Sequence, residues 1–337
     1  MSPATFASKH PLPEGWSSPT FVQDTIVADG LELARCGVVA MSPRGEEITG
    51  SAADVGTTSS HRGYYELLER VATVAAAGEG RSRWDLCDRA GTLRDHLAGE
   101  ELFPSSVAPS RWRFARSNGV ALHATWEQAC DRAYWELVER DRILRSWYGE
   151  ISPSVLLDDW GKQSLRRLAS YDVRAYAFPG RAGGWGEEIS VAGVFAFPTA
   201  EGHPFFCGFA ARPSLVDAAN AAEGEALQQL AFLWGEEIPR SFPPSAPFPL
   251  AHLERSLFPA HQVRIRRWLG GGHVQFDREP ETRGQPSGTT LFVDLTPAWL
   301  GDLRVAKAIS AAATPLTFGE GPFGEHLPAE LRLHPIA

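Results

Sequence analysis

Two short stretches of the sequence, YYELLER at 64–70 and YWELVER at 134–140, repeat the same arrangement of charged residues. Each offers two glutamates three residues apart, followed directly by an arginine. The residues are Glu66, Glu69 and Arg70 in the first stretch, and Glu136, Glu139 and Arg140 in the second. Residues three apart share one face of a helix, so each pair of carboxylates can approach one hard cation such as Mg²⁺.

A third predicted helix carries Glu225 and Gln228 at the same spacing. Three helices that present oxygen ligands in matching phase would surround Mg²⁺ and a triphosphate. The alternative is a solvated helix face on which Arg70 and Arg140 form salt bridges with the glutamates. The duplication of the motif weakens this alternative without removing it.

The elements that position these residues follow from hydrophobic periodicity. Helices are expected at 59–77, 83–98, 125–148 and 214–235. Strands are expected at 19–50, 111–117, 173–178, 191–197, 204–210, 291–295 and 303–309. This mixture predicts an α+β protein with several sheets. No clean boundary interrupts the chain, so a single domain over residues 1–337 is expected.

Composition excludes several classes of protein. The chain has 337 residues and a net charge of −9, which argues against binding to duplex nucleic acid. No apolar run is long enough to span a membrane, and the N-terminus lacks the pattern of a secretory signal. The four cysteines lie far apart and form no metal-binding pattern, so they are expected as free thiols. A cytoplasmic protein is predicted.

The chain resembles the YcaO family, whose members carry a strand ending in SNG and then a helix with ExxERD. The segment SNGVALHATWEQACDRAYWELVERD at 117–141 carries this pattern. Further matches are ELLER (66–70), GFAARPSLVDAANAAEGEALQQ (208–229), VDLT (293–296), the strand at 303–309 and RLHPI (332–336). The resemblance implies an α+β fold with several mixed sheets, in which the ExxER and ExxQ helices surround a central cavity.

The resemblance also implies a chemistry. YcaO proteins typically bind ATP and Mg²⁺ and activate a peptide carbonyl by phosphorylation, so that a nucleophile forms an azoline, a thioamide or an amidine in a ribosomally made natural product. The family's magnesium-directed carboxylates would correspond to Glu66, Glu69, Glu136, Glu139 and Glu225. Arg70, Arg140 and Gln228 would complete the nucleotide and metal site, and the catalytic residues stay unassigned.

Partners are likewise implied by the resemblance. They are a precursor peptide or peptide-like substrate, and a separately supplied leader-binding or ThiF-like protein or a second YcaO protein. Because the family often forms homodimers, a homodimer is expected.

Five positions depart from the family pattern. At these positions the family carries polar or charged groups near the nucleotide. This chain instead has Arg62, Ala121, Ala124, Gln128 and Leu230. These departures predict weak or absent ATP binding. Two hypotheses follow: a divergent amide-modifying enzyme, or a catalytically silent paralogue that positions an active partner. In the silent paralogue, Arg62, Arg70 and Arg140 would act as internal counter-ions, with Arg62 in the phosphate or metal position.

Two glycine-rich segments are weaker indications of a nucleotide-binding site. GEGPFG at 319–324 fits GxGxxG, but no βαβ unit can follow it, so a dinucleotide-binding fold is not expected. GRAGGWG at 180–186 is expected to be a mobile loop between strands rather than a phosphate cradle.

The family commonly has an arginine where this chain has Leu230. Arg181 or Arg212 would take the place of that arginine.

Overall fold

The chain folds into two compact units, each assembled from separate stretches of sequence. The computed structural model describes residues 7–57, 60–104, 112–156, 160, 164–181, 183–237, 249–270, 289–319 and 333–336. Unit 1 comprises Met1–Phe103, Arg116–Leu137 and Thr290–Ile309. Unit 2 comprises Pro104–Ala115, Val138–Thr289 and Ser310–Ala337. The single domain expected over residues 1–337 stays a prediction.

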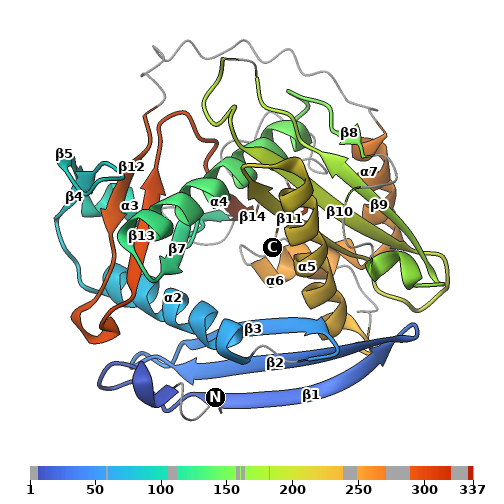
Figure 1. Ribbon diagram of the computed structural model, residues 1–337, viewed down its shortest axis with the longest axis horizontal. Helices are drawn as coiled ribbons and strands as arrows, with labels where there is room; N and C mark the ends of the chain where they lie inside the picture. The colour runs from blue at the N-terminus through green and yellow to red at the C-terminus, as the bar shows by residue number, and fades with distance from the viewer. Residues whose placement is uncertain are drawn as a thin grey trace. The chain divides into compact units, whose positions relative to one another are not determined.

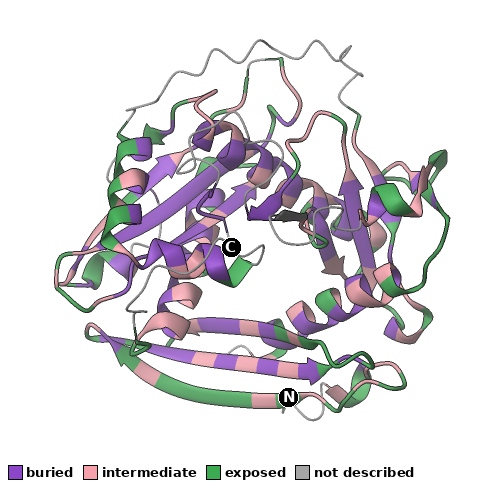
Figure 2. Ribbon diagram, turned by 180° about the vertical axis from the view of Figure 1, so that it is seen from behind, coloured by how far each residue is buried: buried purple, intermediate pink, exposed green. Residues whose placement is uncertain are grey.

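The first sheet of unit 1 is antiparallel and has three strands in the order β1-β2-β3. The strands are β1 (Thr20–Ala28), β2 (Leu31–Met41) and β3 (Glu47–Val55). Helix α2 (Ser60–Gly78) lies along one face of this sheet (Figure 1). A Cβ atom on Gly50 would lie 2.1 Å from the Gly63 carbonyl oxygen, so the close approach of helix and strand requires glycine. The outer strand β1 is exposed over most of its length (Figure 2).

The second sheet of unit 1 has five strands in the order β5-β4-β12-β13-β7. They are β4 (Arg83–Cys87), β5 (Leu93–Ala98), β7 (Val120–His123), β12 (Leu291–Asp294) and β13 (Arg304–Ile309). The short helices α3 (Gly99–Leu102) and η2 (Ala298–Leu300) follow β5 and β12. The helix expected at 83–98 is wrong, because the Asp88 carboxylate accepts the N–H groups of Ala90 and Thr92 and turns the chain into a hairpin.

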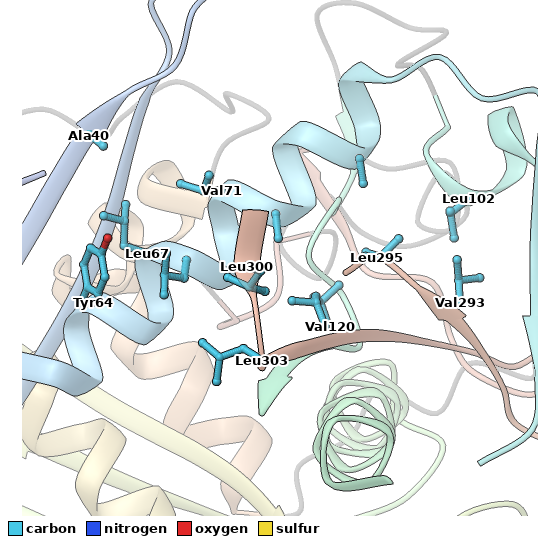
Figure 3. Close-up of a cluster of buried hydrophobic side chains, with 14 of the residues drawn as sticks. Ala40, Tyr64, Leu67, Val71, Leu102, Val120, Val293, Leu295, Leu300 and Leu303 are labelled. Carbon is cyan, nitrogen blue, oxygen red and sulfur yellow. The ribbon is translucent and has the colours of Figure 1, made fainter. Parts of the chain in front are cut away.

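The core of unit 1 lies where α2 meets the two sheets. Its apolar side chains come from α2, from β2 of the first sheet, from β4, β7, β12 and β13 of the second, and from α3 and η2 (Figure 3). Tyr64, Leu67 and Val71 of α2 are fully buried at the three- and four-residue spacing of an amphipathic helix. Because that face packs into the core, the charged residues between these positions lie on the sides of the helix.

Unit 2 is built on an antiparallel sheet in the order β11-β10-β9-β8 and a two-stranded sheet of β14 and β6. The strands are β6 (Trp112–Phe114), β8 (Ser154–Val155), β9 (Tyr171–Ala177), β10 (Ser190–Pro198), β11 (Phe206–Arg212) and β14 (Thr317–Gly319). The helices are η1 (Ser164–Arg167), α5 (Leu215–Leu233), α6 (Pro249–Ser256) and α7 (Pro259–Leu269). Of the GxGxxG segment at 319–324, residues 320–324 lie outside the described residues, as does Arg332 of the RLHPI segment.

Helix α5 packs directly on β10 and β11 (Figure 1). A Cβ atom on Gly208 would lie 2.3 Å from both the Ala222 oxygen and the Ala226 nitrogen, so the helix backbone touches the strand. Helix α7 contributes aromatic contacts to the same sheet: Trp268 packs edge-on against Phe195 with 5.8 Å between ring centroids.

The loop after β9 is held by a buried arginine. Arg142 donates hydrogen bonds to the carbonyl oxygens of Phe178, Ile189 and Gly186. Arg142 is 5% exposed, so these carbonyls replace water around its charge. Both ends of the segment GRAGGWG at 180–186 therefore lie beside the hydrogen-bonded Arg142 side chain. The mobility of this segment stays a prediction.

Helix α4 (Trp126–Trp147) is continuous and confirms the helix expected at 125–148. Its first half belongs to unit 1 and its second half, from Val138 onward, belongs to unit 2. In the described part of the chain no helix is long and apolar enough to cross a membrane. The four cysteines are free thiols, as expected.

Candidate functional site

The first ExxER motif lies on α2, where two of its charged residues bind the open edge of β3. The Glu66 carboxylate accepts the backbone N–H of Ser51 at 2.7 Å, and Arg70 donates to the Thr49 carbonyl oxygen at 2.8 Å. Residues two apart on a strand point their backbone groups to the same side. Glu66 and Arg70 are also paired with each other at 2.5 Å. The pair therefore takes the place of a neighbouring strand along β3.

Glu69, the second carboxylate of this motif, faces a different neighbour. Its Oε2 accepts the backbone N–H of Leu122 on β7 at 2.9 Å. Burial raises the pKa of Glu69 to about 8, and the nearby negative charge of Glu136 raises it as well. This shift favours the protonated form of the Glu69 carboxyl group.

Lys307, which the sequence pattern does not single out, belongs to the same group of charges. It lies in β13 between the core residues Val305 and Ile309 and is 5% exposed. Its Nζ donates to the carbonyl oxygens of Arg116 at 2.9 Å and Asn118 at 2.8 Å. Burial lowers the pKa of Lys307 to about 8, and the charge of Glu136 opposes this shift. A lysine within an apolar strand of a chain with three lysines was the available signal.

In unit 2 the second glutamate of the other motif is also paired with cations. Glu139 is 8% exposed, and its Oε1 lies 3.3 Å from Nε of Arg140. Burial raises the pKa of Glu139, while the charges of Arg140 and Arg212 and a hydrogen bond from the Ala211 backbone lower it. Arg212, rather than Arg181, is thus the arginine that faces a carboxylate of the expected set. Arg181 is exposed and lies 3.9 Å from Glu150.

The third motif lies on α5, with its residues in different environments. Glu225 is exposed, Gln228 is half-buried and Leu230 is fully buried. Leu230 belongs to the apolar face of α5, so an arginine at this position would be placed in the core. The neighbouring Gln229 accepts the backbone N–H of Cys207 at 2.6 Å and fixes the helix to β11.

The remaining departures are exposed or belong to secondary structure. Arg62 pairs with Asp54 of β3 at 2.7 Å, with 43% of its side chain exposed. The prediction that Arg62 fills a phosphate or metal position is therefore not supported by its contacts. Ala121 is a buried member of β7, opposite Ala306 of β13. Ala124 and Gln128 are exposed at the start of α4.

These contacts test how well the residues fit Mg²⁺. Carboxylate oxygens are suitable ligands, but two of these groups are already paired with arginine: Glu66 with Arg70, and Glu139 with Arg140. Among the described residues no three His, Cys, Asp or Glu side chains lie together as a metal site requires. As they stand, these residues do not fit a bare Mg²⁺ ion. That the five glutamates converge on one site stays a prediction, since Glu66, Glu69 and Glu136 are in unit 1 and Glu139 and Glu225 in unit 2.

The family of the chain follows from its sequence. The model of the family described as YcaO cyclodehydratase, ATP- and Mg²⁺-binding, matches residues 95–310. This match covers more than half of the 337 residues, and the chain belongs to the YcaO family. The resemblance inferred from the ExxER and SNG motifs is confirmed, and ATP and Mg²⁺ are confirmed as the cofactors of the family. A comparison with curated proteins finds no match.

Solved structures share the fold at low sequence identity. A YcaO protein from Methanopyrus kandleri, bound with AMPPCP and Mg²⁺, is 17% identical with a TM-score of 0.62, over 93% of this chain and 91% of that one. A heterocyclase in complex with substrate and cofactor is 16% identical with a TM-score of 0.58, and the match covers 94% of this chain but only 52% of that one. A chain of the E. coli microcin synthetase complex with a bound pro-peptide is 10% identical with a TM-score of 0.56, over 89% of both chains. The expected α+β fold with several sheets is confirmed.

Proposed function

We propose that this chain acts on the backbone amide or carbonyl of a peptide or peptide-like substrate in the biosynthesis of a ribosomally made natural product. Membership of a family described as cyclodehydratases carries the proposal. Relatives of the same fold described as a heterocyclase with substrate and a synthetase with a pro-peptide support a peptide substrate. The product would be an azoline, a thioamide or an amidine.

The chemical problem is that an amide oxygen is a poor leaving group. In this family ATP, when bound, supplies the phosphoryl group that converts this oxygen into a better one. We assign no residue of this chain a catalytic role.

A second candidate function is that of a catalytically silent paralogue that positions an active partner. The observation that favours it is the pairing of Glu66 with Arg70 and of Glu139 with Arg140 and Arg212. Because arginines of the protein neutralise these carboxylates, the chain needs no metal ion there to stay folded. Weak or absent binding of ATP, proposed from the departures at Arg62, Ala121, Ala124, Gln128 and Leu230, belongs to this function.

Calorimetric titration with ATP and Mg²⁺ separates the two candidates. Micromolar binding, together with a mass change of a precursor peptide incubated with this chain alone, supports the enzyme. Absence of binding, together with faster modification by a second YcaO protein when this chain is added, supports the silent partner. A variant that restores the family's polar groups (Arg62→Ser, Ala121→Ser, Ala124→Asn, Gln128→Glu) is the matched comparison, and we expect it to bind ATP more tightly.

The assembly of the chain is a further part of the proposal. The partners would be a precursor peptide and a separately supplied leader-binding or ThiF-like protein, or a second YcaO protein, with this chain as a homodimer. Light scattering at micromolar concentration tests the dimer, and a monomeric mass contradicts it.

A further inference from the structure

Unit 1 has two open sheets and therefore four outer strands, three of which have side chains that discourage a further strand from pairing. Glu66 and Arg70 bind backbone groups of β3, and Glu69 accepts a backbone N–H of β7. Strand β5 carries three exposed polar or charged residues, Arg94, Asp95 and His96. The edges of β3, β5 and β7 are thus poor sites for the addition of a strand.

The fourth outer strand, β1, has no such protection. It is exposed over most of its length (Figure 2), contains neither proline nor lysine, and pairs with β2 over nine consecutive residues without a bulge. Its one charged residue, Asp24, is bound by Arg35 of β2 through hydrogen bonds of 2.7 and 3.0 Å. In the described part of the chain no backbone hydrogen bond outside this ladder involves β1. The backbone groups on its outer side are therefore available to another strand.

The residue types of β1 also favour pairing. Five of its nine residues are β-branched, the type that packs well against the side chains of a neighbouring strand. Among them, Val22 is 64% exposed and Val27 is 63% exposed. Successive side chains of a strand point to opposite faces, so these two valines lie on different faces of the sheet. A strand added beside β1 would cover an exposed valine on each face.

We propose that β1 is the dimer interface of this chain, where it pairs antiparallel with β1 of a second copy about a two-fold axis. Two identical strands satisfy the outward backbone groups of both copies at once. With the axis beside Asp24, Val22 lies opposite Ile26 of the second copy on one face, and Phe21 lies opposite Val27 on the other. Two sheets of three strands become one continuous antiparallel sheet.

A second copy suits this edge better than an unrelated strand, because the pairing matches apolar residues on both faces. Only Asp24 meets its own copy at the axis, and the bound Arg35 guanidinium neutralises each carboxylate within its own chain. This inference deepens the homodimer that forms part of the proposed function and rests on that homodimer. The proposed action on a peptide amide does not enter the argument.

The first test measures the dissociation constant of the dimer by sedimentation or light scattering over a dilution series. The wild-type chain should be a dimer at micromolar concentration. Val22→Lys/Val27→Lys should raise the Kd of the dimer at least about tenfold, because the symmetry repeats each lysine on both paired strands. Val55→Lys, at an exposed position of β3 in the same sheet, is the control and should leave this Kd unchanged. Circular dichroism should show that both proteins fold.

A second test locates the axis and does not depend on the lysine variant. In Asp24→Cys the two new thiols face each other across the axis, with about 4.5–5.5 Å between Cα atoms, which a disulfide can bridge. In Thr20→Cys, on the same strand, they lie about 27 Å apart. Mild oxidation should therefore link two copies of Asp24→Cys, whereas Thr20→Cys and the wild-type chain should stay unlinked.

Three outcomes overturn the proposal. A monomeric wild-type chain would do so, and β1 would then be open to a peptide strand instead. An equal Kd for the wild-type chain and Val22→Lys/Val27→Lys would place the dimer interface elsewhere and leave the homodimer standing. Equal cross-linking of Asp24→Cys and Thr20→Cys, or none of either, would exclude the paired strands. Since none of these measurements uses ATP or a peptide, the proposed chemistry is tested separately.

Discussion

At Glu69, burial and a neighbouring carboxylate outweigh the hydrogen bond from Leu122, and the group behaves as a weak acid near neutral pH. The sequence pattern treats Glu66 and Glu69 as equivalent ligands. Their surroundings separate them, because Glu66 lies beside Arg70 and the edge of β3, whereas Glu69 points to β7. Helical spacing predicts which residues share a face, but it says nothing of the partners that a tertiary fold brings to each.

The raised pKa of Glu69 gives a pH-dependent stability. Between the ordinary pKa of 4.5 and about 8, the folded carboxyl group keeps a proton that the unfolded chain has released. The free energy of unfolding should therefore fall as pH rises through this window. Glu69→Gln imitates the protonated group and still accepts the Leu122 N–H, so the fall should be smaller by about 1 kcal/mol or more.

Denaturant unfolding of both proteins over the same pH range checks this expectation. Glu79→Gln, an exposed glutamate just after α2, should keep the wild-type profile. Parallel profiles for the wild-type chain and Glu69→Gln would show that the carboxyl group titrates normally.

At the scale of elements, the long periodic helices were predictable and the short ones were not. Helices α2, α4 and α5 follow from sustained apolar spacing over about 20 residues each. The hairpin of β4 and β5 was mistaken for a helix, because the decisive signal is a turn built on the side chain of one residue, Asp88. Helices α6 and α7 and strand β14 were not predicted, since short segments near proline-rich sequence carry little periodicity.

The contact of α5 with β11 predicts opposite effects for two glycines. Gly208→Ala should destabilise the chain by about 3 kcal/mol or more, because the new methyl group would overlap the helix backbone at 2.3 Å. Gly224→Ala, within α5 itself, meets nothing within 4 Å and should stabilise the chain by about 0.5–1 kcal/mol. Urea denaturation of the two variants measures both effects, and equal shifts would contradict the packing.

At the scale of the whole molecule, buried histidines of unit 2 and Glu69 of unit 1 respond to pH in opposite directions. In unit 2, burial lowers the pKa of His252 to about 4 and that of His261 to about 4, and it also lowers the pKa of His334 well below its usual range. His252 Nε2 accepts the Gly319 N–H, and its Nδ1 donates to the His334 carbonyl oxygen. Protonation would replace the accepting nitrogen by a donor and break this chain of hydrogen bonds.

The expected result is a unit-specific response to acid. Below the ordinary histidine pKa of 6.5 the unfolded histidines bind protons that the folded ones do not, so these histidines reduce the stability of unit 2 as pH falls. Over the same range unit 1 gains stability from Glu69. Hydrogen exchange at about pH 5 and about pH 7.5, corrected for intrinsic rates, should show protection lost in unit 2 and retained or raised in unit 1. A uniform change across both units would contradict this.

The ion pair of Glu66 and Arg70 along β3 bears on how ExxER motifs are interpreted in genomes. An unpaired strand edge is a template for aggregation, and natural proteins cover such edges with charged side chains. A lineage that had lost all use for nucleotide would therefore still be under selection to keep this glutamate and this arginine. The presence of the first motif in a divergent sequence is thus explained by its role in covering the edge of a sheet. Catalysis has to be inferred from residues that have no such structural role.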